Sequence, residues 1–294
     1  MSLAGPGGLP TYVLTLRCPD QAGIVHAVTG VLVEQHGNIL ESQQFDDLAG
    51  GSFFMRVRFS IDTQESSGVA LEQLREAFAP VGERFAMTWN LWEATAPYRT
   101  LILVSKLSHC LNDLLFRWSN QALQIDVVGI VSNHADCEPL AKSYGVPYHF
   151  LPVTSGAKAA AEAEMLALVD SLDIDLVVLA RYMQVLSDDT CRALSGRAIN
   201  IHHSFLPSFR GARPYHQAFD RGVKLVGATA HYVTGDLDEG PIIEQDVMRV
   251  DHAYDAAELA AAGRDVESQV LSRAVRWHAE SRVLLNRHKT VVFR

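Results

Sequence analysis

From about residue 100 onward the sequence alternates short apolar segments with segments of helical spacing, and this alternation constrains the fold more than any other feature. A strand that is apolar on both faces is typical of a parallel sheet covered by helices on both sides. Right-handed crossovers then place the carboxyl ends of such strands along one edge, where open α/β folds bind ligands. The apolar segments are TLILVS (100–105), DVVGIVS (126–132), PYHFLPV (147–153) and DLVVLA (175–180).

The intervening segments have the apolar spacing of helices. In the last of them, Val266, Val270, Ala274 and Trp277 lie along one helical face. We therefore predict a Rossmann-like, mostly parallel sheet for residues 100–294. The predicted helices are 113–121, 138–144, 157–172, 188–194 and a final helix over 255–285.

Residues 9–93 show another pattern, in the order βαββαβ, which predicts a ferredoxin-like domain. In the third strand, arginines at 56 and 58 alternate with apolar residues, which is the period of a half-buried strand. A short linker at 94–99, interrupted by Pro97, separates this domain from the next. The predicted strands are 11–18, 39–47, 52–62 and 86–93, and the predicted helices are 24–35 and 68–85.

Charge and composition exclude some partners. The formal net charge is −9, which argues against nucleic-acid binding because phosphate neutralisation needs clustered Lys and Arg. No apolar run approaches the roughly 18 residues of a spanning helix, so no membrane partner is expected. The cysteines form no CxxC pair, which argues against a zinc site or a disulfide framework and favours the reducing cytoplasm. A lone nucleophilic thiol is the alternative. The cysteines are Cys18, Cys110, Cys137 and Cys191.

Three polar residues are candidates for carbonyl chemistry. Asn200 and His202 stand two apart at the end of a predicted strand, so their side chains share one face. Asp238 lies further on, in a polar turn between two predicted strands. An amide can donate to a developing oxyanion, an imidazole can donate a proton, and a carboxylate can orient the imidazole or hold a water.

Two other interpretations of these residues stay open on the pattern alone. In the first, Asn200 is a turn former, the histidines form hydrogen bonds with backbone carbonyls, and the aspartates only make a surface loop hydrophilic. In the second, His202, His203, His216 and His231 bind a metal. The second is disfavoured because adjacent residues of an extended chain point to opposite sides. We expect no metal.

The segments 175–187 and 200–245 closely resemble the signature regions of the tetrahydrofolate-dependent formyltransferase family. The resemblance covers about residues 100–294. It implies that the catalytic groups of that family fall on Asn200, His202 and Asp238. It also implies that the folate pterin contacts Gln184, Val185 and Leu186 and the loop from Thr234 to Asp238, with the folate consumed as substrate and no separate cofactor.

Within this family the chain resembles the hydrolytic members more than the transferases that act on glycinamide ribonucleotide. The glycine-rich phosphate loop of those transferases is replaced by residues 104–111, VSKLSHCL, and the family's His-Pro-Ser reads His202-His203-Ser204. This implies hydrolysis of 10-formyltetrahydrofolate to formate and tetrahydrofolate, which supplies formate for purine biosynthesis and balances one-carbon pools. The alternatives are formyl transfer to an amine and an amino-acid sensor on an inactive scaffold. The roles of Lys106, His109 and His203 stay open.

The N-terminal block resembles an ACT domain, whose D-x-x-G-I turn matches Asp20, Gly23 and Ile24. Free amides at the start of the following helix can receive a carboxylate, and Asn38 can bind an amino group. The resemblance implies an amino-acid effector, glycine or methionine, and pairing into a homo-oligomer, at least a dimer and compatible with a tetramer. A plain dimerisation module is the alternative.

Overall fold

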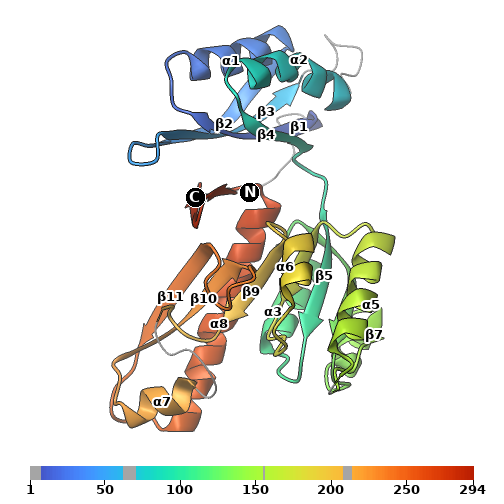
Figure 1. The fold of residues 1–294 in the computed structure, drawn as a ribbon, viewed down its shortest axis with the longest axis vertical. Coiled ribbons are helices and arrows are strands. Elements are labelled where there is room, and N and C mark those ends of the chain that lie inside the picture. The colour runs from blue at the N-terminus through green and yellow to red at the C-terminus, as the bar shows by residue number, and fades with distance from the viewer. Residues whose placement is uncertain (1–7, 62–70, 155, 208–213) are drawn as a thin grey trace. The chain divides into compact units, whose positions relative to one another are not determined.

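The structure is a computed structural model that describes residues 8–61, 71–154, 156–207 and 214–294, with backbone alone at Pro214 and His216. It divides into two compact units (Figure 1). The first holds the described residues up to Ala96 together with Glu280–Asn286 and Val291–Arg294, and the second holds Pro97–Ala279 and Arg287–Thr290. Over these described ranges, no helix combines the length and the apolarity that crossing a membrane requires.

The first unit is a four-stranded antiparallel sheet with two helices on one face, so the predicted ferredoxin-like order is confirmed. Its core lies between sheet and helices, where Leu14, Val28, Val57 and Phe78 are all less than 5% exposed. The strand order is β2-β3-β1-β4. The elements are β1 (Thr11–Pro19), α1 (Ile24–Glu34), β2 (Gly37–Asp47), β3 (Ser52–Ile61), α2 (Leu71–Arg84) and β4 (Thr88–Glu93).

The prediction that the third strand is half-buried was wrong, because the opposite face of β3 is covered as well. Arg56 is 1% exposed; its guanidinium donates to the backbone oxygens of Glu280 and Ser281 and lies 3.2 Å from Glu41. The covering segment is the C-terminal end of the chain, and a pattern read within one strand carries no information about such a distant segment.

The second unit is a seven-stranded sheet in the order β11-β10-β9-β8-β5-β6-β7. The five strands from β9 to β7 run parallel to one another, and β10 runs antiparallel to both of its neighbours, β9 and β11. The prediction of a mostly parallel sheet is therefore confirmed. The strands are β5 (Tyr98–Val104), β6 (Ile125–Ser132), β7 (Tyr148–Phe150), β8 (Leu176–Leu179), β9 (Ala198–His202), β10 (Leu225–Tyr232) and β11 (Ile242–Arg249).

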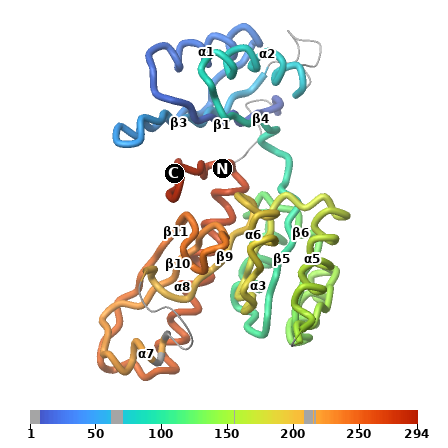
Figure 2. Tube along the Cα trace, viewed as in Figure 1, coloured from blue at the N-terminus to red at the C-terminus, as the bar shows by residue number. Residues whose placement is uncertain are grey.

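Helices cover both faces of this sheet (Figure 2). The long helix α8 lies against β9, β10 and β11, with α3 beside it. On the other face, Met165 of α5 and Cys191 of α6 pack on Leu101 and Val177. The helices are α3 (His109–Ser119), α4 (Glu138–Ser143), α5 (Lys158–Ser171), α6 (Asp188–Ala193), α7 (Pro214–Asp220) and α8 (Ala256–Ala279).

The final helix was predicted to continue to residue 285, and this was wrong. Helix α8 ends at Ala279, and Ser281 follows with a φ of 53°, in the left-handed region where a helix stops. The chain then forms a hairpin of β12 (Val283–Asn286) and β13 (Lys289–Val292). Leu284 and Phe293 pack on Phe54 of β3, and this packing requires an extended chain rather than another helical turn.

Candidate active site

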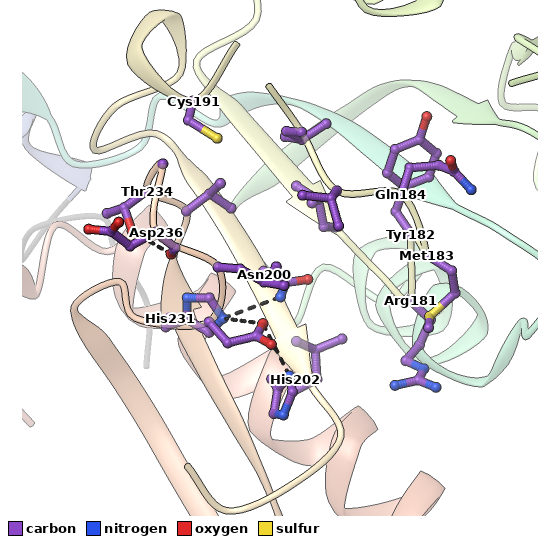
Figure 3. A pocket seen from close by; sticks show the side chains of 18 of the residues that line it. Arg181, Tyr182, Met183, Gln184, Cys191, Asn200, His202, His231, Thr234 and Asp236 are labelled. Atoms are coloured by element: carbon purple, nitrogen blue, oxygen red, sulfur yellow. Dashed lines mark hydrogen bonds and ion pairs between the residues drawn. The ribbon is translucent and has the colours of Figure 1, made fainter. Parts of the chain in front are cut away.

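One pocket of about 210 Å³ in the second unit collects most of the predicted site residues. Most of its lining comes from three segments: the loop that follows β8, the end of β9, and the loop between β10 and β11. In Figure 3, Asn200, His202 and His231 lie on one side, and Arg181, Met183 and Gln184 lie on the other. The parallel strands β8 and β9 end at this edge of the sheet, as the predicted topology requires.

Asn200 is held by a histidine from the neighbouring strand. Asn200 and His231 are directly paired across β9 and β10, and Asn200 Nδ2 lies 3.2 Å from His231 Nε2. His231 Nδ1 lies 2.9 Å from the backbone oxygen of Tyr232, which can only accept, so Nδ1 carries the proton. Burial lowers the pKa of His231, so the ring is neutral and its Nε2 accepts from the Asn200 amide.

His202 and Asp238 form a second pair. His202 is 4% exposed, and its Nδ1 lies 3.2 Å from Asp238 Oδ1. The hydrogen bond from His202 lowers the pKa of Asp238 despite its partial burial, so Asp238 is a carboxylate at neutral pH. The other ring nitrogen of His202, Nε2, is buried without a partner among the described residues. That nitrogen is therefore available to a bound molecule.

Strand β10 runs antiparallel to β9 and ends away from His202. The loop between β10 and β11 therefore has to return towards the end of β9, and this places Asp238 next to His202. Asp238 has a φ of 58°. The loop is closed by the backbone bond from Tyr232 N to Pro241 O. Gly240 makes this closure possible, since a Cβ there would lie 1.7 Å from the backbone oxygen of Tyr232.

The residues predicted to contact the pterin also line the pocket: Gln184, Val185, Leu186 and Thr234. The loop that holds Gln184, Val185 and Leu186 is anchored at both ends. Ser105 Oγ accepts from Met183 N, and Glu162 accepts from the backbone and hydroxyl of Ser187. Met183, Val185 and Leu237 are 57%, 55% and 60% exposed, so the rim offers apolar surface to a flat ring.

The expectation that His202 and His203 point apart was wrong, because β9 ends at His202 and strand alternation ends with it. The two ring centroids are 5.0 Å apart, and both residues line the pocket. Among the side chains that the structure describes, the one group of potential metal ligands within 4.8 Å of one another is His109, Cys110 and Glu267. The predicted histidine set is not among these groups, and the His216 side chain lies outside the described residues.

The remaining candidates lie elsewhere. Lys106 is exposed, and neither it nor His109 is among the lining residues of this pocket. All four cysteines are free and buried, and burial raises the pKa of Cys110. Such a thiol is poorly suited to act as a nucleophile.

The comparisons with known proteins agree with this geometry. The Formyl transferase family matches residues 98–275, and the ACT domain family matches residues 12–79. The chain is 54% identical over 283 residues to the formyltetrahydrofolate deformylase of Corynebacterium sp. (strain P-1), covering 96% of this chain and 98% of that protein. The chain belongs to the formyltetrahydrofolate deformylase family.

Solved structures separate the deformylases from the transferases. The formyltetrahydrofolate deformylase of Burkholderia mallei ATCC 23344 matches with a TM-score of 0.92 and 52% identity, over 97% of this chain and 100% of that one. Glycinamide ribonucleotide transformylase 1 from Symbiobacterium toebii matches with a TM-score of 0.65 and 27% identity, over 70% of this chain and 98% of that one. The transferase likeness thus spans a smaller share of this chain.

The residues predicted to bind an amino-acid effector lie in the first unit. Gly23 is the N-cap residue of α1, with a φ of 96°, and it makes no side-chain cap bond to the first amides of that helix. Asp20 and Asn38 are exposed, at the end of β1 and the start of β2. Ile24 is 2% exposed and belongs to the core, so its side chain is structural.

Several pocket residues were not predicted as part of this site, and two of them are important here, His231 and Arg181. His231 was considered only as a metal ligand, and Arg181 was not considered at all. A histidine inside the apolar strand 225–232 was the available signal for the first, but its pairing with Asn200 depends on strand register. Arg181 has a φ of 66°, an unusual conformation for a residue other than glycine, which the sequence does not reveal.

Proposed function

We propose that this chain hydrolyses 10-formyltetrahydrofolate to formate and tetrahydrofolate. The observation that carries the proposal is the Nε2 of His202 in the pocket, which has no partner among the described residues, on a ring whose Nδ1 faces the Asp238 carboxylate. The similarity to formyltetrahydrofolate deformylases over nearly the whole chain supports it. Transfer of the formyl group to an amine is not favoured.

Asn200 and His202 would stabilise the oxyanion. One N–H of the Asn200 amide goes to His231, so the amide is fixed and its second N–H can face the formyl oxygen. A carboxylate next to Nδ1 stabilises the imidazolium that arises when Nε2 also carries a proton. His202 Nε2 would donate first to the oxyanion and then to the leaving folate nitrogen.

Asp238 would direct the water. Its Oδ1 contacts His202, and its Oδ2 would hold the water that attacks the formyl carbon. A carbon–oxygen bond forms, Asp238 takes a proton from the water, and the tetrahedral adduct then collapses. The bond between the formyl carbon and the folate nitrogen breaks, and the nitrogen receives the Nε2 proton of the His202 imidazolium. Formic acid leaves and loses its remaining proton to the solvent as formate, and Asp238 and His202 regain their starting protonation through the solvent.

The folate would lie with its pterin against Gln184, Val185 and Leu186 and against the loop that begins at Thr234. The apolar rim at Met183 and Leu237 supports this placement. The folate is the substrate in this reaction, and the proposed steps use no organic cofactor and no metal.

The test is release of formate from 10-formyltetrahydrofolate by the purified protein with no amine added. We expect equal amounts of formate and tetrahydrofolate over many turnovers. If formate appeared only when an amine acceptor was supplied, or if the formyl group ended on that acceptor, the hydrolase proposal would fail.

We also propose that the first unit binds an amino acid, glycine or methionine, at the turn of Asp20 and Gly23 and at Asn38. The first amides of α1, which receive no side-chain bond from Gly23, can bind the carboxylate of that amino acid. Pairing of these units would give a homo-oligomer of two or four chains. Four free cysteines and the folate substrate support a role in the cytoplasm.

A further inference from the structure

Glu267 of α8 is a buried carboxylate next to the pocket, and three other elements reach it. Its side chain is 1% exposed. His109 Nε2 of α3 lies 2.7 Å from Glu267 Oε2, and the Tyr215 hydroxyl of α7 donates to Oε1 at 2.6 Å. Arg181 Nε lies 3.4 Å from Oε2. Burial raises the pKa of Glu267, but the bond from His109, the charge of Arg181 and the Tyr215 hydroxyl outweigh it, so the group is ionised.

Arg181 connects this carboxylate to the pterin side of the pocket. It lines the pocket in the loop after β8, three residues before Gln184. Its φ of 66° costs free energy in a residue with a Cβ, and such strain persists only where the surroundings hold it. The ion pair with Glu267 is one contact that holds Arg181 in this conformation.

Tyr215 connects the same carboxylate to the catalytic histidine. Its ring lies against α8 where Gly263 leaves room, since a Cβ on Gly263 would be 2.1 Å from the ring. Gly263 is one helical turn before Glu267. The Tyr215 ring centroid is 6.4 Å from that of His203, which is 5.0 Å from that of His202.

We propose that Glu267 is a positioning residue, which fixes Arg181 on the pterin side and Tyr215 behind His203 so that the folate and His202 keep their relative placement. This rests on the hydrolysis proposed above. Stability alone is a weak reason for the arrangement, because a buried ion pair loses most of its attraction to desolvation. A function in placing two sides of one site explains why three other elements converge on this one carboxylate of α8.

The experiment compares kcat and KM for 10-formyltetrahydrofolate in Tyr215→Phe, Gly263→Ala and Glu267→Gln. Tyr215→Phe removes one hydrogen bond, so kcat should fall with KM nearly unchanged. Gly263→Ala should displace Tyr215 and lower kcat in the same way with Glu267 intact. Glu267→Gln should lower kcat by about 10- to 100-fold and also raise KM, because it releases Arg181 as well.

A double variant separates one shared function from several independent ones. If Tyr215 acts through Glu267, adding Tyr215→Phe to Glu267→Gln should reduce kcat little further, whereas independent effects would multiply. Glu244→Gln is the matched control: Glu244 is also buried in this unit, 3.7 Å from Arg273, and is not among the pocket residues. It should lower the melting temperature while kcat and KM stay near wild type.

The proposal is overturned if the Glu267 and Tyr215 variants, folded at the assay temperature, keep kcat and KM within twofold of wild type. It is also overturned if Glu244→Gln changes kcat and KM as Glu267→Gln does, which would mean a general loss of stability. A wild-type protein that releases no formate would instead contradict the hydrolase proposal itself, and the positioning function with it.

Discussion

Asn200 and His231 face each other across two antiparallel strands, and the amide nitrogen of one lies 3.2 Å from the ring nitrogen of the other. The backbone oxygen of Tyr232 fixes the protonated nitrogen of His231. The chain thereby determines which end of the Asn200 amide is the donor, before any substrate binds. A donor oriented in advance is worth more to an oxyanion than one that must reorganise.

Replacement of His231 should therefore impair catalysis although His231 makes no contact with the reacting atoms in the proposed mechanism. In His231→Ala the Asn200 amide loses its acceptor and can rotate, so we expect kcat to fall about 10-fold or more. Steady-state kinetics checks this. The control is His278→Gln, which removes a partly buried imidazole, bonded to Tyr232 and absent from the pocket residues, and should keep kcat. Equal losses in both variants would contradict the prediction.

Removal of the amide itself should cost more. Asn200→Ala deletes the proposed oxyanion donor, and such losses typically lower the rate by roughly 10²- to 10³-fold. In the proposed mechanism the amide interacts with the transition state, so binding of a folate analogue should be largely retained. Turnover measurements test the expected loss of rate, and isothermal titration with a folate analogue tests the expected retention of binding. An Asn200→Ala protein that lost folate binding along with its activity would assign Asn200 to substrate binding instead.

His203 should be uncharged during turnover. Burial, and then the positive charge of Arg181 and the neighbouring His202, lower the pKa of His203 from 6.5 to about 4. The unfolded chain would bind this proton first, so the contribution of His203 to stability is complete above pH 6.5 and decreases as the pH falls towards 4. NMR of the imidazole nitrogens, assigned with His203→Gln, should show a neutral ring at pH 6. A protonated His203 ring at that pH would contradict this account.

Much of the fold could be predicted because most of its signals are local. The apolar runs 100–105 and 175–180 became β5 and β8, and spacing alone gave the helix from Ile24. The failures came from contacts between distant segments. The burial of Arg56 on β3, and the end of α8 before the predicted residue 285, both depend on the C-terminal hairpin, which packs on β3.

The candidate site shows the same division. Asn200 and His202 could be paired from strand periodicity, Asp238 could be named as a candidate from its polar turn, and the family resemblance added Gln184. His231 and Glu267 could not be found in this way. The first acts through its register against β9, and the second through side chains of three other elements.

Turnover by Asp238→Asn, measured beside folate binding, tests the central claim most directly, since the amide keeps the shape of the carboxylate and loses its charge. Asp238 is proposed to hold the water, take its proton and face His202, so we predict a loss of activity larger than that of Asn200→Ala with binding retained. The lowered pKa of Asp238 also predicts that the wild-type carboxylate stays ionised down to below pH 3.8. Hydrolysis by folded Asp238→Asn at the wild-type rate would contradict the account.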